Sequence, residues 1–269
     1  MNLKVMKLHF LFMCMGAVLF SAAAAVLTVP SDSAKTISAA MSVAKRGDTV
    51  KVMEGVFKET VYISPGVCLL SDKQFGAVID GGGRGTIVTL GTGATISGFE
   101  IKNGTIGVLS TSSQTGVTQC RITQNLQSGI MCVGHLPKIE DNLIVFNRGS
   151  GIQGWDVRTT SASINHNTIA YNGNHGIALG GNSAVSIENN IIAFNDQFGI
   201  KPGDETVRVE LLNNNLFQNT KFSGNLPEDN ISADPMFIDA KRHNFKMNKE
   251  SKSVGLGTDN QNLGARIEY

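Results

Sequence analysis

A repeat centred on asparagine constrains the fold of this chain more than any other feature. Asparagine recurs every 22 to 25 residues, at Asn125, Asn147, Asn172, Asn195 and Asn219. Three positions before each comes an apolar residue: Ile122, Ile144, Ile169, Ile192 and Leu216. Two positions earlier again come Cys120, Asn142, Asn167, Asn190 and Asn214. A Gly-Ile pair follows the first four: Gly129-Ile130, Gly151-Ile152, Gly176-Ile177 and Gly199-Ile200. Four columns that keep one phase indicate a structural repeat.

The repeat predicts a right-handed parallel β-helix. Segments such as Val185–Ile187 alternate apolar with small or polar residues, which is typical of short strands. Asparagine tolerates the left-handed backbone conformation and can bond to the same residue in the next coil, so we expect it to form ladders at the bends. A leucine-rich repeat would need a leucine-dominated pattern, and a left-handed β-helix would need a six-residue period. Neither is found in the sequence.

Both ends of the repeat predict caps. The segment Ser31–Arg46 has apolar residues at helical spacing and ends before Gly47, which indicates a capping helix. After the repeat, Asp234–Asp239 and a lysine-rich segment predict an irregular C-terminal cap. The expected architecture is therefore one all-β domain over residues 26–269.

The first 25 residues have the layout of a secretory signal peptide. Lys4 and Lys7 precede an apolar stretch, Leu8–Phe20, and a run of small residues, Ser21–Ala25, follows it. The stretch is short for a membrane span, which needs about 20 apolar residues. We therefore expect cleavage and export to the periplasm, the medium or the cell surface, with no membrane span in the mature protein.

Composition limits the partners. With 23 Lys+Arg, 22 Asp+Glu and a net charge of +1, the chain does not resemble a nucleic-acid binder, which must neutralise many phosphates. Cys68, Cys120 and Cys132 remain after cleavage, and their odd number favours buried thiols over a disulfide framework. We expect a monomer.

The chain resembles the pectate-lyase-like superfamily, specifically bacterial right-handed parallel β-helix repeat proteins. The resemblance rests on Thr36–Ala40, Gly47–Val50, Gly55–Glu59, the repeats themselves, and Asp234–Asp239 with Leu263–Ala265. It implies polysaccharide lyases, hydrolases, esterases or epimerases, besides members without known activity. The Asn-Thr-Asp, Asp-Asp and Gly-His-Gly signatures of polygalacturonases are missing. So are the Asp-Pro-His-Asp of mannuronan epimerases and the catalytic stretch of pectin methylesterases.

Strand alternation identifies the residues that should face outward from the Gly-Ile strands. If the isoleucines point inward, one outward column contains Met131, Gln153, Ala178 and Lys201, and a second contains Val133, Trp155, Gly180 and Gly203. Trp155, the single tryptophan, would be a stacking platform for a sugar ring, unless a neighbouring loop covers it.

The turns beside these strands supply polar candidates: Arg148, Asp156, Arg158, His175, Asp204 and Glu205. A lyase acting on an acidic sugar needs a base and a cation that neutralises the carboxylate. Lys201, His175 and Asp156 are the candidate catalytic residues, with Asp156 or Asp204 as possible Ca²⁺ ligands. Trp155, Gln153, Arg148 and Arg158 are the candidate substrate-binding residues. A hydrolase would instead use two carboxylates, and Asp156 with Asp204, two coils or about 9.6 Å apart, fits only the inverting spacing.

Two functions follow from these residues. The first is an exported protein that binds or processes a polysaccharide, with an acidic glycan and a lyase reaction as one form of it. The alternative is a non-catalytic surface or scaffold protein, such as an adhesin or assembly factor, because no titratable residues converge in a recognised motif.

Overall fold

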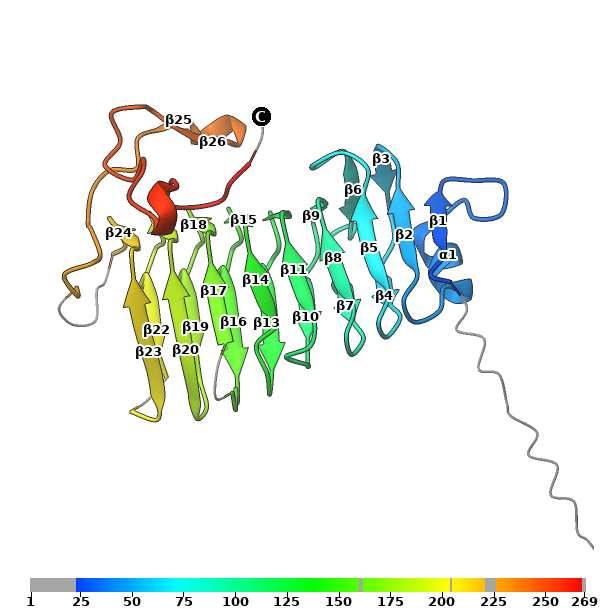
Figure 1. The fold of residues 1–269 in the computed structure, drawn as a ribbon, viewed down its shortest axis with the longest axis horizontal. Coiled ribbons are helices and arrows are strands. Elements are labelled where there is room, and N and C mark those ends of the chain that lie inside the picture. The colour runs from blue at the N-terminus through cyan, green and yellow to red at the C-terminus, as the bar shows by residue number, and fades with distance from the viewer. Residues whose placement is uncertain (1–22, 160–161, 204, 221–225, 268–269) are drawn as a thin grey trace, which may run out of the picture.

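The computed structural model describes residues 23–159, 162–203, 205–220 and 226–267, and they form a parallel β-solenoid (Figure 1). From β2 to β24, each coil contributes one strand to each of three parallel sheets, so strands three apart in the sequence pair with each other, and β1 pairs with β2. Because no coil can bury its apolar side chains alone, stacking of the coils creates the core. The all-β prediction is confirmed.

Sheet A has nine strands: β1 (Val26–Val29), β2 (Thr49–Val52), β5 (Cys68–Ser71), β8 (Thr95–Ser97), β11 (Gly116–Thr118), β14 (Lys138–Glu140), β17 (Ala162–Asn165), β20 (Ser183–Glu188) and β23 (Val207–Leu212). Sheet B has eight: β3 (Gly55–Phe57), β6 (Ala77–Asp80), β9 (Glu100–Lys102), β12 (Arg121–Thr123), β15 (Leu143–Val145), β18 (Thr168–Ala170), β21 (Ile191–Ala193) and β24 (Asn215–Phe217). Sheet C has seven: β4 (Val61–Ile63), β7 (Thr86–Leu90), β10 (Ile106–Ser110), β13 (Ile130–Val133), β16 (Ile152–Trp155), β19 (Ile177–Leu179) and β22 (Ile200–Pro202).

The Gly-Ile pairs begin the last four strands of sheet C, as the repeat predicts. Ile130, Ile152, Ile177 and Ile200 are partners in consecutive pairings and are all buried. The glycine before each isoleucine approaches the next coil closely. A Cβ on Gly151 would lie 2.6 Å from the Ile169 side chain and 2.8 Å from the Gly176 carbonyl oxygen. The pair therefore serves packing, because only glycine fits where two coils meet.

Two asparagine ladders stabilise the bends on either side of sheet B. In the ladder between sheets A and B, the Asn142 amide N and Nδ2 both donate to Asn167 Oδ1, at 3.0 and 2.9 Å. The second ladder, between sheets B and C, runs from Asn125 to Asn219 with the same geometry. Asn230, which the repeat did not reveal, extends the first ladder by accepting from Asn214.

The left-handed backbone lies one residue earlier than the asparagine spacing predicts. The residues with positive φ at the first ladder are Asp141, His166, Asn189 and Asn213, at 58°, 51°, 56° and 53°. The expectation that the ladder asparagines themselves are left-handed is therefore wrong. The preceding residue has the left-handed conformation that turns the chain. The side chain of the asparagine after it forms hydrogen bonds to the neighbouring coils.

The first coil is closed by α1 (Ile37–Val43), which is shorter than the predicted segment. Its N-terminus is well capped, because Thr36 accepts from the Ala39 amide and the Glu59 carboxylate accepts from the amides of Ile37 and Ser38. Ile37, Ala40 and Met41 are buried, as their spacing predicts.

The C-terminal segment covers the outer face of sheet B. We call residues 237–267 the strap; it contains β25 (Phe237–Asp239), the 3-10 helix η1 (Ala240–Arg242), β26 (Asn244–Met247), antiparallel to β25, and η2 (Thr258–Asn260). It runs back over the later coils (Figure 1) and buries outward-facing apolar residues of sheet B: Leu143, Val145, Ala170, Ile191 and Ala193. The predicted cap thus also seals one side of the solenoid.

Aromatic side chains and one arginine attach the strap. The rings of Phe146, Tyr171 and Phe194 stack along one bend, at centroid distances of 5.3 and 4.8 Å, and Phe245 of the strap packs against the first two. At the other bend, Arg266 donates to both carboxylate oxygens of Asp141, at 2.7 and 2.6 Å. This ion pair raises the pKa of Arg266.

Candidate functional site

The outer face of sheet C carries the column that strand alternation predicts. Met131 pairs with Gln153, Gln153 with Ala178, and Ala178 with Lys201. The same column continues through earlier coils to Leu109, Thr89 and Tyr62. The column therefore has one position per coil, at a spacing of about 4.8 Å, but Ala178, between Gln153 and Lys201, is buried.

Trp155 ends β16 and is 56% exposed. Its strand partner is Val133, which is 41% exposed, so two exposed apolar side chains lie next to each other at the ends of β13 and β16. At an exposure of 56%, the indole is not covered by any loop of the described residues, contrary to the alternative of a buried ring. Tyr62, 57% exposed on β4, is a second aromatic residue on the same sheet.

Lys201 and Gln153 are accessible on this face, whereas His175 is not. Lys201 is exposed on β22, two coils from Gln153, and no ion pair to it is found in the described part of the chain. His175 is buried before β19, and its Nδ1 accepts from the Phe198 amide at 3.2 Å. The His175 ring therefore supports the neighbouring coil. His175 is therefore not exposed on this face, and its catalytic role stays a prediction.

Asp156 is paired within its own turn. Arg158 donates to its two carboxylate oxygens, at 3.2 and 2.9 Å, and both side chains are largely exposed. Asp204 lies outside the described residues. Within the described ranges, no group of three His, Cys, Asp or Glu side chains is arranged to hold a metal ion. The Ca²⁺ site thus stays a prediction.

Arg148 is separated from Trp155. It precedes β16, whereas Trp155 ends that strand. Arg148 lines a hollow of about 530 Å³ with Asp80, Asn103 and Phe146. Asp80 is already engaged there, because its carboxylate accepts from Asn103 Nδ2 at 3.0 Å. Arg148 was predicted to lie on the same face as Trp155, but the length of one strand separates them.

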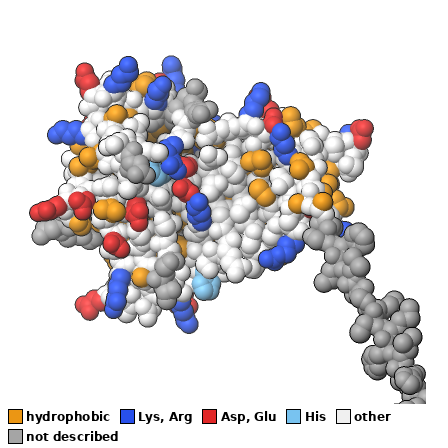
Figure 2. All heavy atoms as spheres, viewed as in Figure 1, with side chains coloured by type: hydrophobic (Ala, Val, Ile, Leu, Met, Phe, Trp, Pro, Cys, Tyr) orange, Lys and Arg blue, Asp and Glu red, His pale blue; other side chains and the backbone are white. Residues whose placement is uncertain are grey.

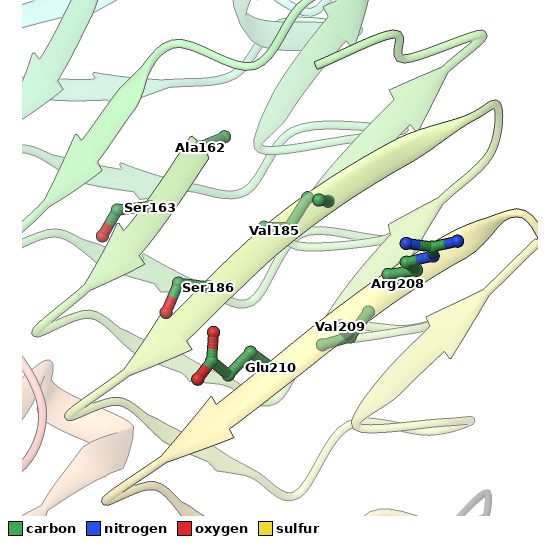
Figure 3. A pocket seen from close by; sticks show the side chains of 8 residues that line it. Ala162, Ser163, Val185, Ser186, Arg208, Val209 and Glu210 are labelled. Atoms are coloured by element: carbon green, nitrogen blue, oxygen red, sulfur yellow. The ribbon is translucent and has the colours of Figure 1, made fainter. Parts of the chain in front are cut away.

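A hollow that the sequence did not predict lies on the outer face of sheet A (Figure 3). Ser163, Ser186 and Glu210 form a row across β17, β20 and β23, and Arg208 lies on the same strand as Glu210. The alternation in Val207–Leu212 was the available signal, because it places Arg208 and Glu210 on one outward face. The hollow has a volume of about 530 Å³.

Residues 85–226 match the family model described as a right-handed β-helix region, which spans more than half of the chain. The chain belongs to this right-handed β-helix family. None of the curated proteins matches this β-helix sequence.

Solved structures with a similar fold include two carbohydrate-active enzymes. A pectate lyase, Pel9A, is 12% identical, with a TM-score of 0.49, over 91% of this chain and 96% of that chain. A pectin methylesterase from Aspergillus niger is 16% identical, with a TM-score of 0.40, over 79% of this chain and 87% of that chain. At these identities, the likeness concerns the β-helix fold alone.

Proposed function

We propose that this β-helix is an exported protein that binds an extended polysaccharide along the outer face of sheet C. The observation that carries the proposal is the exposure of Trp155, 56%, beside Val133 on a regular parallel sheet. Large aromatic side chains are usually buried, and an exposed indole offers an apolar face on which a sugar ring can stack.

The geometry of the sheet suits a chain of repeating units. The column from Tyr62 through Gln153 to Lys201 repeats at about 4.8 Å, close to the length of one sugar residue in an extended glycan. Gln153 can donate and accept hydrogen bonds, and Lys201 can donate three. Gln153 and Lys201, two coils apart, can therefore contact different sugars of one chain, with Trp155 as the apolar anchor.

Binding is better supported than catalysis by the described residues. Of the candidate catalytic residues, His175 is buried and its Nδ1 accepts from the Phe198 amide, so its ring is not exposed beside Lys201. An unsaturated product, followed by its ultraviolet absorbance on uronate polymers, would add lyase activity to the proposal.

Export is proposed from the N-terminal sequence, in which basic residues precede an apolar stretch and small residues. In the described part of the chain, no helix has the length and apolar character needed to cross a membrane. Cell fractionation and N-terminal sequencing of the recovered protein test this. An intact N-terminus in the cytoplasmic fraction would contradict export.

A glycan array followed by calorimetry tests the binding proposal. We expect the Trp155→Ala variant to lose about tenfold or more in affinity, since an aromatic stacking contact contributes on the order of 1 kcal/mol beyond its buried area. Ile238→Ala is the matched control, because Ile238 is also 56% exposed but lies in the strap.

The proposal fails if the wild-type protein binds no glycan, or if Trp155→Ala binds as well as Ile238→Ala. In the first case, a specific protein partner in pull-down experiments would favour the scaffold function.

A further inference from the structure

The hollow on sheet A extends around the edge of the solenoid into a second one. The two hollows, of about 530 and 460 Å³, share Ala184 and Arg208 in their linings. Together they reach from Glu210 on β23 to Arg158, in the turn after β16. Their linings contain none of the outward residues of sheet C, so this is a different surface from the one that carries Trp155.

One end of the joined hollow is cationic. Arg158 and Arg208 both line it, and no ion pair of Arg208 is found among the described residues. Arg158 is paired with Asp156, but their side chains are 72% and 65% exposed, so water screens the pair and an anion can compete for the guanidinium. Arginine binds carboxylate and sulfate groups well, because its planar donors match two oxygens at once.

A neutral polar side chain lies at the same end. Asn182 is exposed in the lining beside the two arginines, and its amide can donate and accept hydrogen bonds. Ser183, the next residue, is 3% exposed and occupies an inward position of β20, so its hydroxyl is not part of the surface of the hollow.

The other end of the hollow is suited to hydroxyl groups. Ala162, Ser163, Ala184 and Ser186 form a floor of small side chains, which leaves room for a ring. The Glu210 carboxylate lies beside Ser186 and can accept from sugar hydroxyls (Figure 3). A polyanion would be repelled by Glu210, whereas a single anionic group could lie at the arginine end.

We propose that this hollow binds one sugar residue that carries an anionic substituent, a carboxylate or a sulfate. Arg158 and Arg208 hold the anionic group, the ring lies over the small residues, and Glu210 accepts from the hydroxyls. This site goes beyond the proposed function because it lies on another sheet and does not require Trp155. Charged residues of both signs gather in this C-terminal half of the molecule, whereas the middle coils are mostly uncharged on the face in Figure 2.

Calorimetry on the full-length protein tests the site with three probes: a uronic-acid oligosaccharide, a sulfated dextran oligosaccharide and unmodified dextran. We expect the Arg158→Gln/Arg208→Gln double variant to lose about tenfold or more in affinity for a charged probe, because charge-assisted hydrogen bonds are strong. Weakened binding of only one charged probe identifies the substituent. The affinity for dextran should not change.

Arg84→Gln is the matched control, since Arg84 is exposed in the turn between β6 and β7 and the charge change per residue is the same. Equal weakening by Arg84→Gln would show a general charge effect and overturn the site. Wild-type affinity of the double variant, or no binding of either charged probe by the wild-type protein, would also overturn it. In a Trp155→Ala background, the arginine double variant should lose the same affinity for the charged probe as it does in the wild-type background. The two proposals can therefore fail independently of each other.

Discussion

Replacing Asn190 by alanine should destabilise the whole solenoid, because this side chain joins three consecutive coils. Its Nδ2 donates to the carbonyls of Ile164 and Glu188, at 2.8 and 2.7 Å, and to Asn214 Oδ1 at 3.0 Å. Its Oδ1 accepts from the amide N and Nδ2 of Asn167, at 2.8 and 3.1 Å. All five bonds are lost in Asn190→Ala.

The expected loss in the free energy of unfolding is about 3 to 5 kcal/mol. A net hydrogen bond contributes about 1 kcal/mol, and a buried group left without a partner costs about 1 to 3 kcal/mol. The Asn167 amide is such a group, because its acceptor disappears. Backbone strain does not contribute, since the left-handed residue of this bend is Asn189.

Chemical denaturation of the wild-type protein and the variant measures this loss. Lys252→Ala is the control; Lys252 is exposed in the strap, and its replacement should change stability by no more than about 0.5 kcal/mol. An Asn190→Ala midpoint equal to that of the wild-type protein would refute the ladder as a source of stability.

Burial lowers the pKa of His166 and of His243 below their ordinary value of 6.5. Below pH 6.5 the unfolded chain therefore binds more protons than the folded protein, and the free energy of unfolding should fall as the pH drops. Above pH 6.5 these two histidines should not affect stability. The free energy of unfolding, measured by denaturation at about pH 8 and about pH 5, should differ less between the two pH values in a variant with both histidines changed to glutamine. Burial raises the pKa of Cys120 and Cys132 to about 12, whereas Cys68 is partly exposed. Of these three cysteines, a thiol reagent should therefore modify only Cys68 in the folded protein and all three after unfolding. Mass spectrometry of the treated protein measures this.

The sequence predicted the solenoid because its signal is periodic. Asn142, Asn167 and Asn190 occupy the same place in successive coils, so each of these coils repeats the evidence of the others. The exposure of Trp155 followed from the same register. The left-handed position did not follow, because asparagine tolerates that conformation and the preceding column varies in residue type, from Asp141 to His166.

The candidate site depended on distances that the order of residues along the chain does not reveal. Arg148 and Arg158 lie close to the two ends of β16 in the sequence, yet they line different hollows. Arg208 lies far along the chain from Arg158, and the stacking of coils brings the two together in one lining.

The sequence by itself determined the repeating coil, its inward isoleucines and its ladder asparagines, because these depend on contacts that recur with each repeat. The tertiary structure alone decided where the non-repeating parts lie. The strap illustrates the difference: the Ala265 amide donates to Thr168 Oγ1 across 97 residues, and Arg266 bonds Asp141 across 125. No local pattern encodes such contacts, because each forms once, between segments that lie far apart in the sequence.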